Sequence, residues 1–241
     1  MKILITAGGT SEPIDNVRKI TNLSTGKLGS IIANTFLKNA NIEKIFYVCS
    51  KTSILPKANR KITITYVETV QNLLETMRQI IIDENIDVVI HSMAVSDYHV
   101  QYVTDSKILS EKLSNKTSFE IEEILSSLSL SLNSKDKISS NKTDLIIRLI
   151  PTPKVISQIK KWNNKVFLIG FKLLSNVEQN KLIDTAKNLM QTNDCDVVVA
   201  NDTKNISTTT HKAYIIKKDG TIHNSNTKQE IANILYNLIN N

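Results

Sequence analysis

"LITAGGTSEPIDNVRKITNLSTGKLGS", residues 4–30, begins as an apolar strand, continues as a long polar loop and ends in residues typical of a helix. Four of the chain's six glycines lie inside this loop or at its edges: Gly8, Gly9, Gly26 and Gly29. A strand that runs through a glycine turn into a helix is typical of the start of a parallel α/β sheet. The stretch raises the question of what the loop binds, and the pattern of the rest of the chain predicts the fold class.

Outward from this stretch, short apolar runs alternate with segments of helical period. The predicted strands are residues 2–6, 44–49, 62–66, 87–91, 166–171 and 196–200, and the predicted helices are 27–39, 69–84, 153–162 and 177–193. This alternation predicts one α/β domain over residues 1–241, with a Rossmann-like, doubly wound and mostly parallel sheet. In such sheets ligands bind beyond the carboxyl ends of the strands.

The end of the chain departs from the alternation. "HKAYIIKKDGTIHN", residues 211–224, predicts a hairpin with Asp219-Gly220 at its turn, and residues 226–239 predict a closing helix. A second departure covers about 101–143, where "LSSLSLSLNSKDKISSNK" is rich in Ser, Lys and Asn. This region is open to two interpretations, a solvated insertion or a flexible flap.

The composition limits the class of protein. With 241 residues and 41% hydrophobic content, the chain can bury a substantial core. The net charge of +7 suits an anionic partner, but scattered lysines equally reflect compositional bias. Cys49 and Cys195 have no Cys-x-x-Cys spacing, and the chain has no apolar run of membrane-spanning length or signal peptide. We therefore expect a cytoplasmic protein with reduced structural thiols.

Two standard phosphate motifs fail on the opening loop. A Walker A loop would need glycine where Thr21 stands and Ser or Thr where Leu28 stands, and the Gly-x-Gly-x-x-Gly fingerprint is absent. An anion is still favoured, because Ser24, Thr25 and Gly26 directly precede a predicted helix N-terminus. Arg18 and Asn22 lie upstream in the same loop and could supply a cation and an amide donor.

Other polar or small residues follow predicted strands. "MAVSDY" brings Ala94, Val95 and Asp97 after one strand, and "LIGFK" places Gly170 and Phe171 at the end of another. Asn201-Asp202 follows a third strand in "VVVAND". Each stretch alone is weak evidence for a binding site, since a residue such as Phe171 is more often part of the core. Together the three stretches predict a ligand site at one sheet edge.

These motifs resemble those of phosphopantothenoylcysteine synthetase. "ITAGGTSEPIDNVRKITNLSTGKLG", "AVSDY", "KIS", "DLIIRLIPTPKVI", "LIGFK" and "DVVVAND" occur in that family's order between residue 3 and about 202. The resemblance implies a stand-alone ligase that works as a homodimer with Mg²⁺ and CTP or ATP, without a flavin. It would couple 4'-phosphopantothenate to L-cysteine through an acyl nucleotidylate, a step of coenzyme A biosynthesis.

The resemblance also implies residue roles. Asn22 would act on the acyl intermediate, and Lys137 of the flap would neutralise charge at the triphosphate. The implied phosphopantothenate site comprises Gly8, Gly9, Thr10, Arg18, Asn22, Ser24, Thr25 and Gly26. The implied nucleotide site comprises Ala94, Val95, Asp97, Lys137, Gly170, Phe171 and Lys187. Metal ligands stay unassigned, because phosphates and water commonly hold Mg²⁺ in such sites.

This chain departs from the family pattern in two places. Ser139-Ser140 stand where fused relatives carry lysines after the flap lysine, with Lys142 a possible substitute, and Lys187 is the only nearby candidate before "DVVVAND". The choice of CTP over ATP therefore stays open. Two alternatives remain: a Rossmann-type NAD(P)-dependent oxidoreductase, which the missing glycine fingerprint disfavours, and a basic nucleic-acid-binding protein, which predicts salt-dependent binding without turnover.

Overall fold

The computed structural model describes residues 1–132, 136–141 and 144–240, and it divides the chain into two compact units. The larger unit comprises Met1–Thr10, Leu23–Val95 and Lys154–Asn241, and the smaller one comprises Ser11–Asn22 and Ser96–Pro153. The expectation of one ligase domain over 1–241 stays a prediction.

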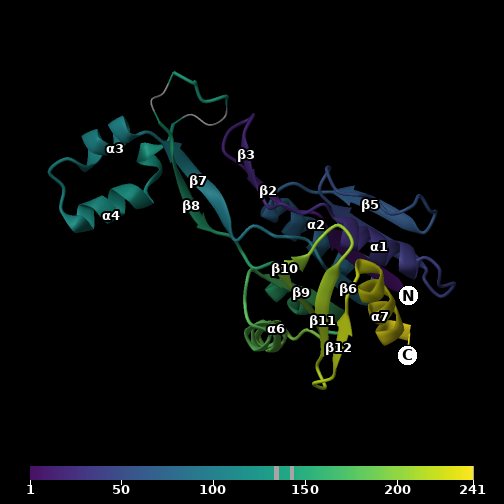
Figure 1. The fold of residues 1–241 in the computed structure, drawn as a ribbon. Coiled ribbons are helices and arrows are strands. Elements are labelled where there is room, and N and C mark those ends of the chain that lie inside the picture. Colours follow the sequence, from purple (N-terminus) through teal and green to yellow (C-terminus); the bar gives the residue numbers. More distant parts are fainter. Residues whose placement is uncertain (133–135, 142–143, 241) are drawn as a thin grey trace. The chain divides into compact units, whose positions relative to one another are not determined.

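The larger unit is built on an eight-stranded sheet (Figure 1). Its strands are β1 (Lys2–Ala7), β4 (Lys44–Cys49), β5 (Ile62–Tyr66), β6 (Val88–His91), β9 (Phe167–Leu174), β10 (Val197–Ile206), β11 (His211–Lys217) and β12 (Ile222–Ser225). The order is β12-β11-β10-β9-β6-β1-β4-β5, and the six strands from β10 to β5 run parallel. The predicted Rossmann-like, mostly parallel α/β sheet is confirmed.

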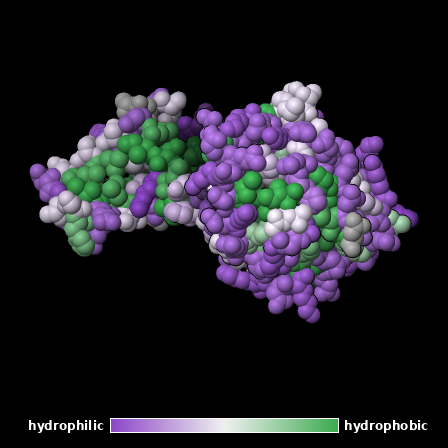
Figure 2. Space-filling view, turned by 60° about the horizontal axis from the view of Figure 1, so that its bottom comes forward, coloured by the Kyte–Doolittle hydropathy of each residue, from purple (hydrophilic) through white to green (hydrophobic). Residues whose placement is uncertain are grey.

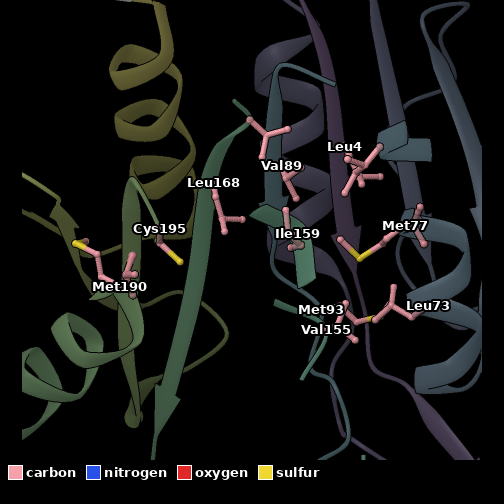
Figure 3. Packing of buried hydrophobic residues seen from close by; sticks show 14 of the residues in the cluster. Leu4, Leu73, Met77, Val89, Met93, Val155, Ile159, Leu168, Met190 and Cys195 are labelled. Carbon is pink, nitrogen blue, oxygen red and sulfur yellow. The ribbon is translucent and has the colours of Figure 1, made fainter. Parts of the chain in front are cut away.

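Helices cover both faces of this sheet. They are α1 (Lys27–Phe36), α2 (Val70–Asp83), α5 (Ile156–Trp162), α6 (Gln179–Asn193) and α7 (Lys228–Asn240). Figure 3 shows Met77 of α2, Ile159 of α5 and Met190 of α6 in the cluster that includes Leu4 and Leu168 of the strands. The cluster on the other face holds residues of α1 and α7, where the Phe36 and Tyr236 rings meet edge to face at 5.5 Å.

Successive strand residues enter opposite clusters. Leu4 packs in the cluster of α2, α5 and α6, whereas its neighbours Ile3 and Ile5 pack in the cluster of α1 and α7. Side chains alternate across a strand, so a strand covered on both faces must be apolar at every position. This explains the uninterrupted apolar runs from which the strands were predicted.

The smaller unit consists of two antiparallel strand pairs and two helices. Its elements are β2 (Ser11–Pro13) paired with β3 (Lys19–Thr21), β7 (Tyr98–Thr104) paired with β8 (Ile146–Pro151), α3 (Ser106–Leu113), α4 (Ser118–Ser126) and the short 3₁₀ helix η1 (Leu128–Leu130). Asp105 caps α3, and Thr117 and Glu120 form a capping box on α4. Figure 2 shows hydrophobic residues gathered on the visible face of this unit.

The elements that were not predicted belong mainly to the smaller unit. β2 and β3 lie inside the polar loop, and α3 and α4 lie inside the region 101–143, which was interpreted as a solvated insertion or a flexible flap without any assigned helix. Neither α3 nor α4 has a buried residue. Lys142 lies outside the described residues.

Two strands of the larger unit also extend beyond their predicted ends. β9 continues to Leu174, so Gly170 and Phe171 lie in the middle of a strand rather than at its end. β10 continues to Ile206, so Asn201 and Asp202 lie within a strand rather than after it. The two strands pair in parallel from Val197 to Asp202, and this pairing carries the polar residues into the sheet. The closing hairpin and helix are confirmed, with Gly220 at the turn in a left-handed conformation.

Candidate functional site

The larger unit brings the carboxyl ends of several strands to one sheet edge. β10, β9, β6 and β1 are consecutive parallel neighbours, so the segments that follow them begin at the same edge. Gly8 follows β1 and Ser92 follows β6. This is the edge at which doubly wound sheets bind ligands.

Gly8 and Gly26 allow two loops to approach each other directly at this edge. Both have positive φ, +84° and +70°. A Cβ atom on Gly8 would lie 2.0 Å from Ser53 Oγ, and one on Gly26 would lie 3.2 Å from the Gly8 backbone nitrogen. The loop after β4 contributes Ser50 and Ser53, whose hydroxyl oxygens are 2.8 Å apart. The serine side chains and the Gly8 backbone therefore fill the space beside the two glycines. We call this close approach the glycine cradle, comprising Gly8, Gly26 and Ser53.

Helix α1 begins at this glycine cradle. Gly26 is its N-cap and makes no side-chain capping hydrogen bond, and the first turn has no acidic residue. The Ile54 N–H donates to the Thr25 carbonyl oxygen at 2.9 Å and holds the approach to the helix in place. The first N–H groups of a helix lack intrahelical partners, and the dipole is positive there, so the beginning of α1 favours an anion.

The continuation of β6 adjoins the same glycines. The Ala94 N–H donates to the Gly8 carbonyl oxygen at 2.8 Å, and the Thr10 N–H donates to the Ala94 carbonyl oxygen at 3.1 Å. Gly9 and Ala94 form a parallel bridge, and Val95 packs against the apolar core beside them. The structure therefore brings together residues that the sequence analysis assigned to two different ligands.

Three other predicted nucleotide residues have different surroundings. A Cβ atom on Gly170 would lie 3.0 Å from Ile156 Cδ1, so this glycine permits close packing of α5 on β9. Phe171 packs against the core on the α1 and α7 face. Lys187 is exposed in the middle of α6, about 12 Å along the helix from Gln179, where α6 begins. A nucleotide role for these three stays a prediction.

In the smaller unit, Arg18 is paired with a carboxylate that the sequence analysis missed. Asp15 is buried, and its Oδ2 accepts hydrogen bonds from Arg18 Nε at 3.0 Å and from the Ile138 N–H at 3.1 Å. Arg18, together with backbone N–H groups, holds the pKa of Asp15 well below its usual value. The spacing of Asp15 and Arg18 was visible in the sequence, but the contact with Ile138 was not.

The remaining predicted residues of the smaller unit are more exposed. Lys137 directly precedes Ile138 and is exposed, and Asn22 is half-buried at the end of the segment Ser11–Asn22. Asp97 is exposed, and its carbonyl oxygen accepts from the Thr152 N–H at 3.0 Å. These side chains are therefore accessible to a ligand.

One titratable group was also missed at the end of β6. His91 is buried, with Nδ1 3.0 Å from Thr6 Oγ1, and burial lowers its pKa to about 4. The ring is therefore neutral at pH 7 and acts as a polar core residue.

Cys49 and Cys195 are free and buried, and burial raises their pKa values to about 11 and about 12, which agrees with structural thiols.

The described residues offer neither a protein cage for a metal ion nor a membrane-spanning helix. Over residues 1–132, 136–141 and 144–240, no three His, Cys, Asp or Glu side chains are grouped so that they could hold a metal ion. No helix in the same part of the chain is both long and apolar enough to cross a bilayer.

Comparisons with known proteins match this chain over its whole length. The bifunctional coenzyme A biosynthesis protein CoaBC of Thermococcus kodakarensis is 29% identical over 218 residues, which cover 90% of this chain and 45% of that protein. A crystal structure of the DNA/pantothenate metabolism flavoprotein from Streptococcus pneumoniae is 38% identical, with a TM-score of 0.86 over 100% of this chain and 98% of that one. The crystal structure of the C-terminal domain of a CoaBC protein is 26% identical, with a TM-score of 0.69 over 99% and 93%.

The chain thus spans less than half the length of the curated relative, and it matches the C-terminal domain of CoaBC almost completely. The family model for the DNA/pantothenate metabolism flavoprotein C-terminal domain matches residues 1–132 and 129–241. The chain belongs to the family of the DNA/pantothenate metabolism flavoprotein C-terminal domain.

Proposed function

We propose that this protein is a phosphopantothenate-cysteine ligase of coenzyme A biosynthesis. The observation that carries the proposal is the glycine cradle at the uncapped start of α1, found in a chain whose relatives are named coenzyme A biosynthesis proteins. The N–H groups at the start of helix α1 suit a phosphate monoester, since its first turn has no acidic residue. The net charge of +7 also suits substrates that are all anionic or zwitterionic.

The phosphopantothenate would bind at the opening loop. Its proposed contacts are Gly8, Gly9, Thr10, Arg18, Asn22, Ser24, Thr25 and Gly26. Arg18 already donates to Asp15, and its Nη2 also donates to the Ile138 carbonyl oxygen at 3.2 Å, so its guanidinium is held in one orientation. An oriented guanidinium is well suited to a planar carboxylate or a phosphate.

The reaction would proceed in two steps. A carboxylate oxygen of phosphopantothenate attacks the α-phosphorus of the nucleotide, which forms an acyl nucleotidylate and releases pyrophosphate. The cysteine amine then attacks the acyl carbon, loses a proton and displaces the nucleoside monophosphate. Lys137 would neutralise charge at the triphosphate in the first step, and Asn22 would donate a hydrogen bond to the carbonyl oxygen on which charge develops in the second.

The nucleotide would bind beside this loop, with CTP as the expected substrate and ATP as the alternative. Ala94 and Val95 would let it approach the backbone, and Asp97 would hydrogen-bond its base or ribose. Gly170, Phe171 and Lys187 complete the proposed set. Mg²⁺ fits this arrangement only as a cation held by the triphosphate and water, since the described residues form no acidic cluster, and it would neutralise the phosphate charge.

We also propose that the protein is a cytoplasmic homodimer. The exposed hydrophobic side chains of the smaller unit, which include Tyr98, Phe119, Ile146 and Leu149, offer material for a subunit contact. Analytical ultracentrifugation over a range of concentrations measures the assembly, and a monomer at every concentration would contradict this part.

Release of pyrophosphate tests the function. The purified protein is incubated with Mg²⁺, phosphopantothenate, cysteine and either CTP or ATP, and controls omit one substrate at a time. We expect release to require phosphopantothenate and one of the two nucleotides, and amide product to require cysteine as well. No pyrophosphate with either nucleotide would reject the ligase.

A further inference from the structure

One short exposed segment of the smaller unit is fixed at a single residue. Ile138 has 5% of its surface exposed, whereas Lys137 before it and Ser139 after it are exposed. The N–H of Ile138 donates to Asp15 Oδ2 at 3.1 Å, and its carbonyl oxygen accepts from Arg18 Nη2 at 3.2 Å. Side chain, N–H and carbonyl group of this one residue are therefore all held.

Asp15 is the common partner in these contacts. Its Oδ1 accepts from the N–H groups of Val17 at 2.9 Å and Arg18 at 2.7 Å, and its Oδ2 accepts from Arg18 Nε and the Ile138 N–H. The side chain has no exposed surface. A buried carboxylate that accepts several hydrogen bonds, some from a cation, forms its strongest contacts in the ionised state.

We infer that Asp15 is a positioning residue for Lys137, because it ties the backbone beside Lys137 to Arg18. This inference rests on the ligase function proposed above. One carboxylate orients the Arg18 guanidinium and holds the N–H of the residue that follows Lys137. The two cations proposed to act on the two anionic substrates are therefore positioned together, although they lie far apart in the sequence.

The substitution Asp15→Asn separates positioning from bulk packing. Asparagine keeps the size of the side chain but replaces one acceptor oxygen with an NH₂ donor. Either orientation of the amide leaves one half of the donor set without an acceptor. Asp196→Asn is the matched control, because Asp196 Oδ2 also accepts from a cation, Lys160 Nζ at 3.0 Å, and from a distant backbone N–H, that of Leu168 at 2.8 Å.

Hydrogen exchange tests the hydrogen bond between the Ile138 N–H and Asp15 without any measurement of enzyme turnover. In Asp15→Asn we expect the Ile138 amide to exchange at least about tenfold faster. A hydrogen bond to a charged acceptor stabilises the closed state by about 1.5–3 kcal/mol, and about 1.4 kcal/mol corresponds to a factor of ten. Exchange within α4 should be unchanged, and Asp196→Asn should leave Ile138 unaffected. An unchanged Ile138 amide, or equal acceleration throughout the smaller unit, would overturn the inference.

Kinetics test the positioning of Lys137. We expect Asp15→Asn to lower kcat for pyrophosphate release about tenfold or more in the wild-type background. The factor should be smaller in a Lys137→Ala background, where only the effect through Arg18 remains. An equal loss of kcat in both backgrounds would refute the inference. If Asp15→Asn does not fold, Ile138→Pro removes the N–H donor together with the buried isoleucine side chain, and Ile138→Ala is its control, because it shortens the side chain but keeps the N–H. We expect a lower kcat in Ile138→Pro than in Ile138→Ala, and equal kcat in the two variants would count against the inference.

The two proposals can fail separately. A wild-type protein that releases no pyrophosphate rejects the ligase, and with it the role of Asp15 in positioning a catalytic lysine. Hydrogen exchange at Ile138 would still show whether Asp15 holds this segment. Normal wild-type turnover together with unaffected Asp15→Asn kinetics would reject the positioning role and leave the ligase standing.

Discussion

Substitution of Gly8 by alanine would disrupt the glycine cradle from inside. The residue has φ of +84°, a conformation that costs an alanine about 1–2 kcal/mol. The new Cβ would also lie 2.0 Å from Ser53 Oγ and 2.5 Å from Ser50 Oγ, and relief of such overpacking commonly costs about 1–3 kcal/mol. We expect Gly8→Ala to lower the free energy of unfolding by about 2–5 kcal/mol in total.

Gly220→Ala is the control for the backbone contribution. Gly220 has φ of +89°, but a Cβ atom there would meet nothing within 4 Å. Gly220→Ala should therefore lower the free energy of unfolding only by the conformational cost, about 1–2 kcal/mol. Urea denaturation of both variants measures the difference, which is the free energy of the close contact at Gly8. Pyrophosphate release should fall in Gly8→Ala and stay unchanged in Gly220→Ala.

A second substitution tests the cause of the clash. Ser53→Ala removes the oxygen that lies 2.0 Å from the position of the new Cβ atom and leaves Ser53 Cβ at 3.3 Å. Gly8→Ala should therefore cost less in a Ser53→Ala background, with a coupling of about 1–3 kcal/mol in the double-mutant cycle. If Gly8→Ala is no more destabilising than Gly220→Ala, or if the cycle shows no coupling, the reasoning about the cradle is refuted.

Three further predictions concern catalysis and pH. Asn22→Ala should still release pyrophosphate in the first turnover but transfer the acyl group to cysteine at least about tenfold more slowly; amide formation at the wild-type rate in a quench experiment would remove Asn22 from this role. Lys137→Ala should lose pyrophosphate release by about tenfold or more while its denaturation midpoint stays unchanged; a normal first step would exclude Lys137. The pKa of His91 is lowered to about 4, so the unfolded chain binds a proton at this residue at a higher pH than the folded protein does. The free energy of unfolding should therefore fall by about 2 kcal/mol between pH 7 and about pH 5 on account of His91, and this part of the slope should be missing in His91→Gln.

The comparison between sequence and structure is clearest for the strands. β4 and β5 have the bounds that were predicted, 44–49 and 62–66. Each is a short run whose residue types favour a strand. By contrast, β9 extends to Leu174 because it pairs with β10, and no property of "FKLL" alone shows that pairing. The residue types along the chain therefore showed where a strand lies, whereas pairing with the neighbouring strand decided how far it extends.

The glycines of the candidate site show the same difference between what the local sequence indicates and what the packing decides. The resemblance assigned Gly8 and Gly26 to the phosphopantothenate site, and their positive φ values show that the backbone there favours glycine. It assigned Gly170 to the nucleotide site, but the missing side chain of Gly170 makes room for Ile156 and Cys195. A glycine in sequence indicates a close neighbour without identifying it, and only the packing distinguishes a ligand loop from a helix contact.

The sequence by itself determined the α/β class, the parallel strands and the loop that begins α1, because these follow from residue type, apolar runs and glycine positions within a few residues of one another. The tertiary structure decided which of the polar residues act together. Asp15 and Ile138 are 123 residues apart, yet Asp15 Oδ2 accepts a hydrogen bond from the Ile138 N–H. No local property of either stretch specifies this pair. Such contacts depend on the folding of the chain in three dimensions, which places groups from distant segments within hydrogen-bonding distance.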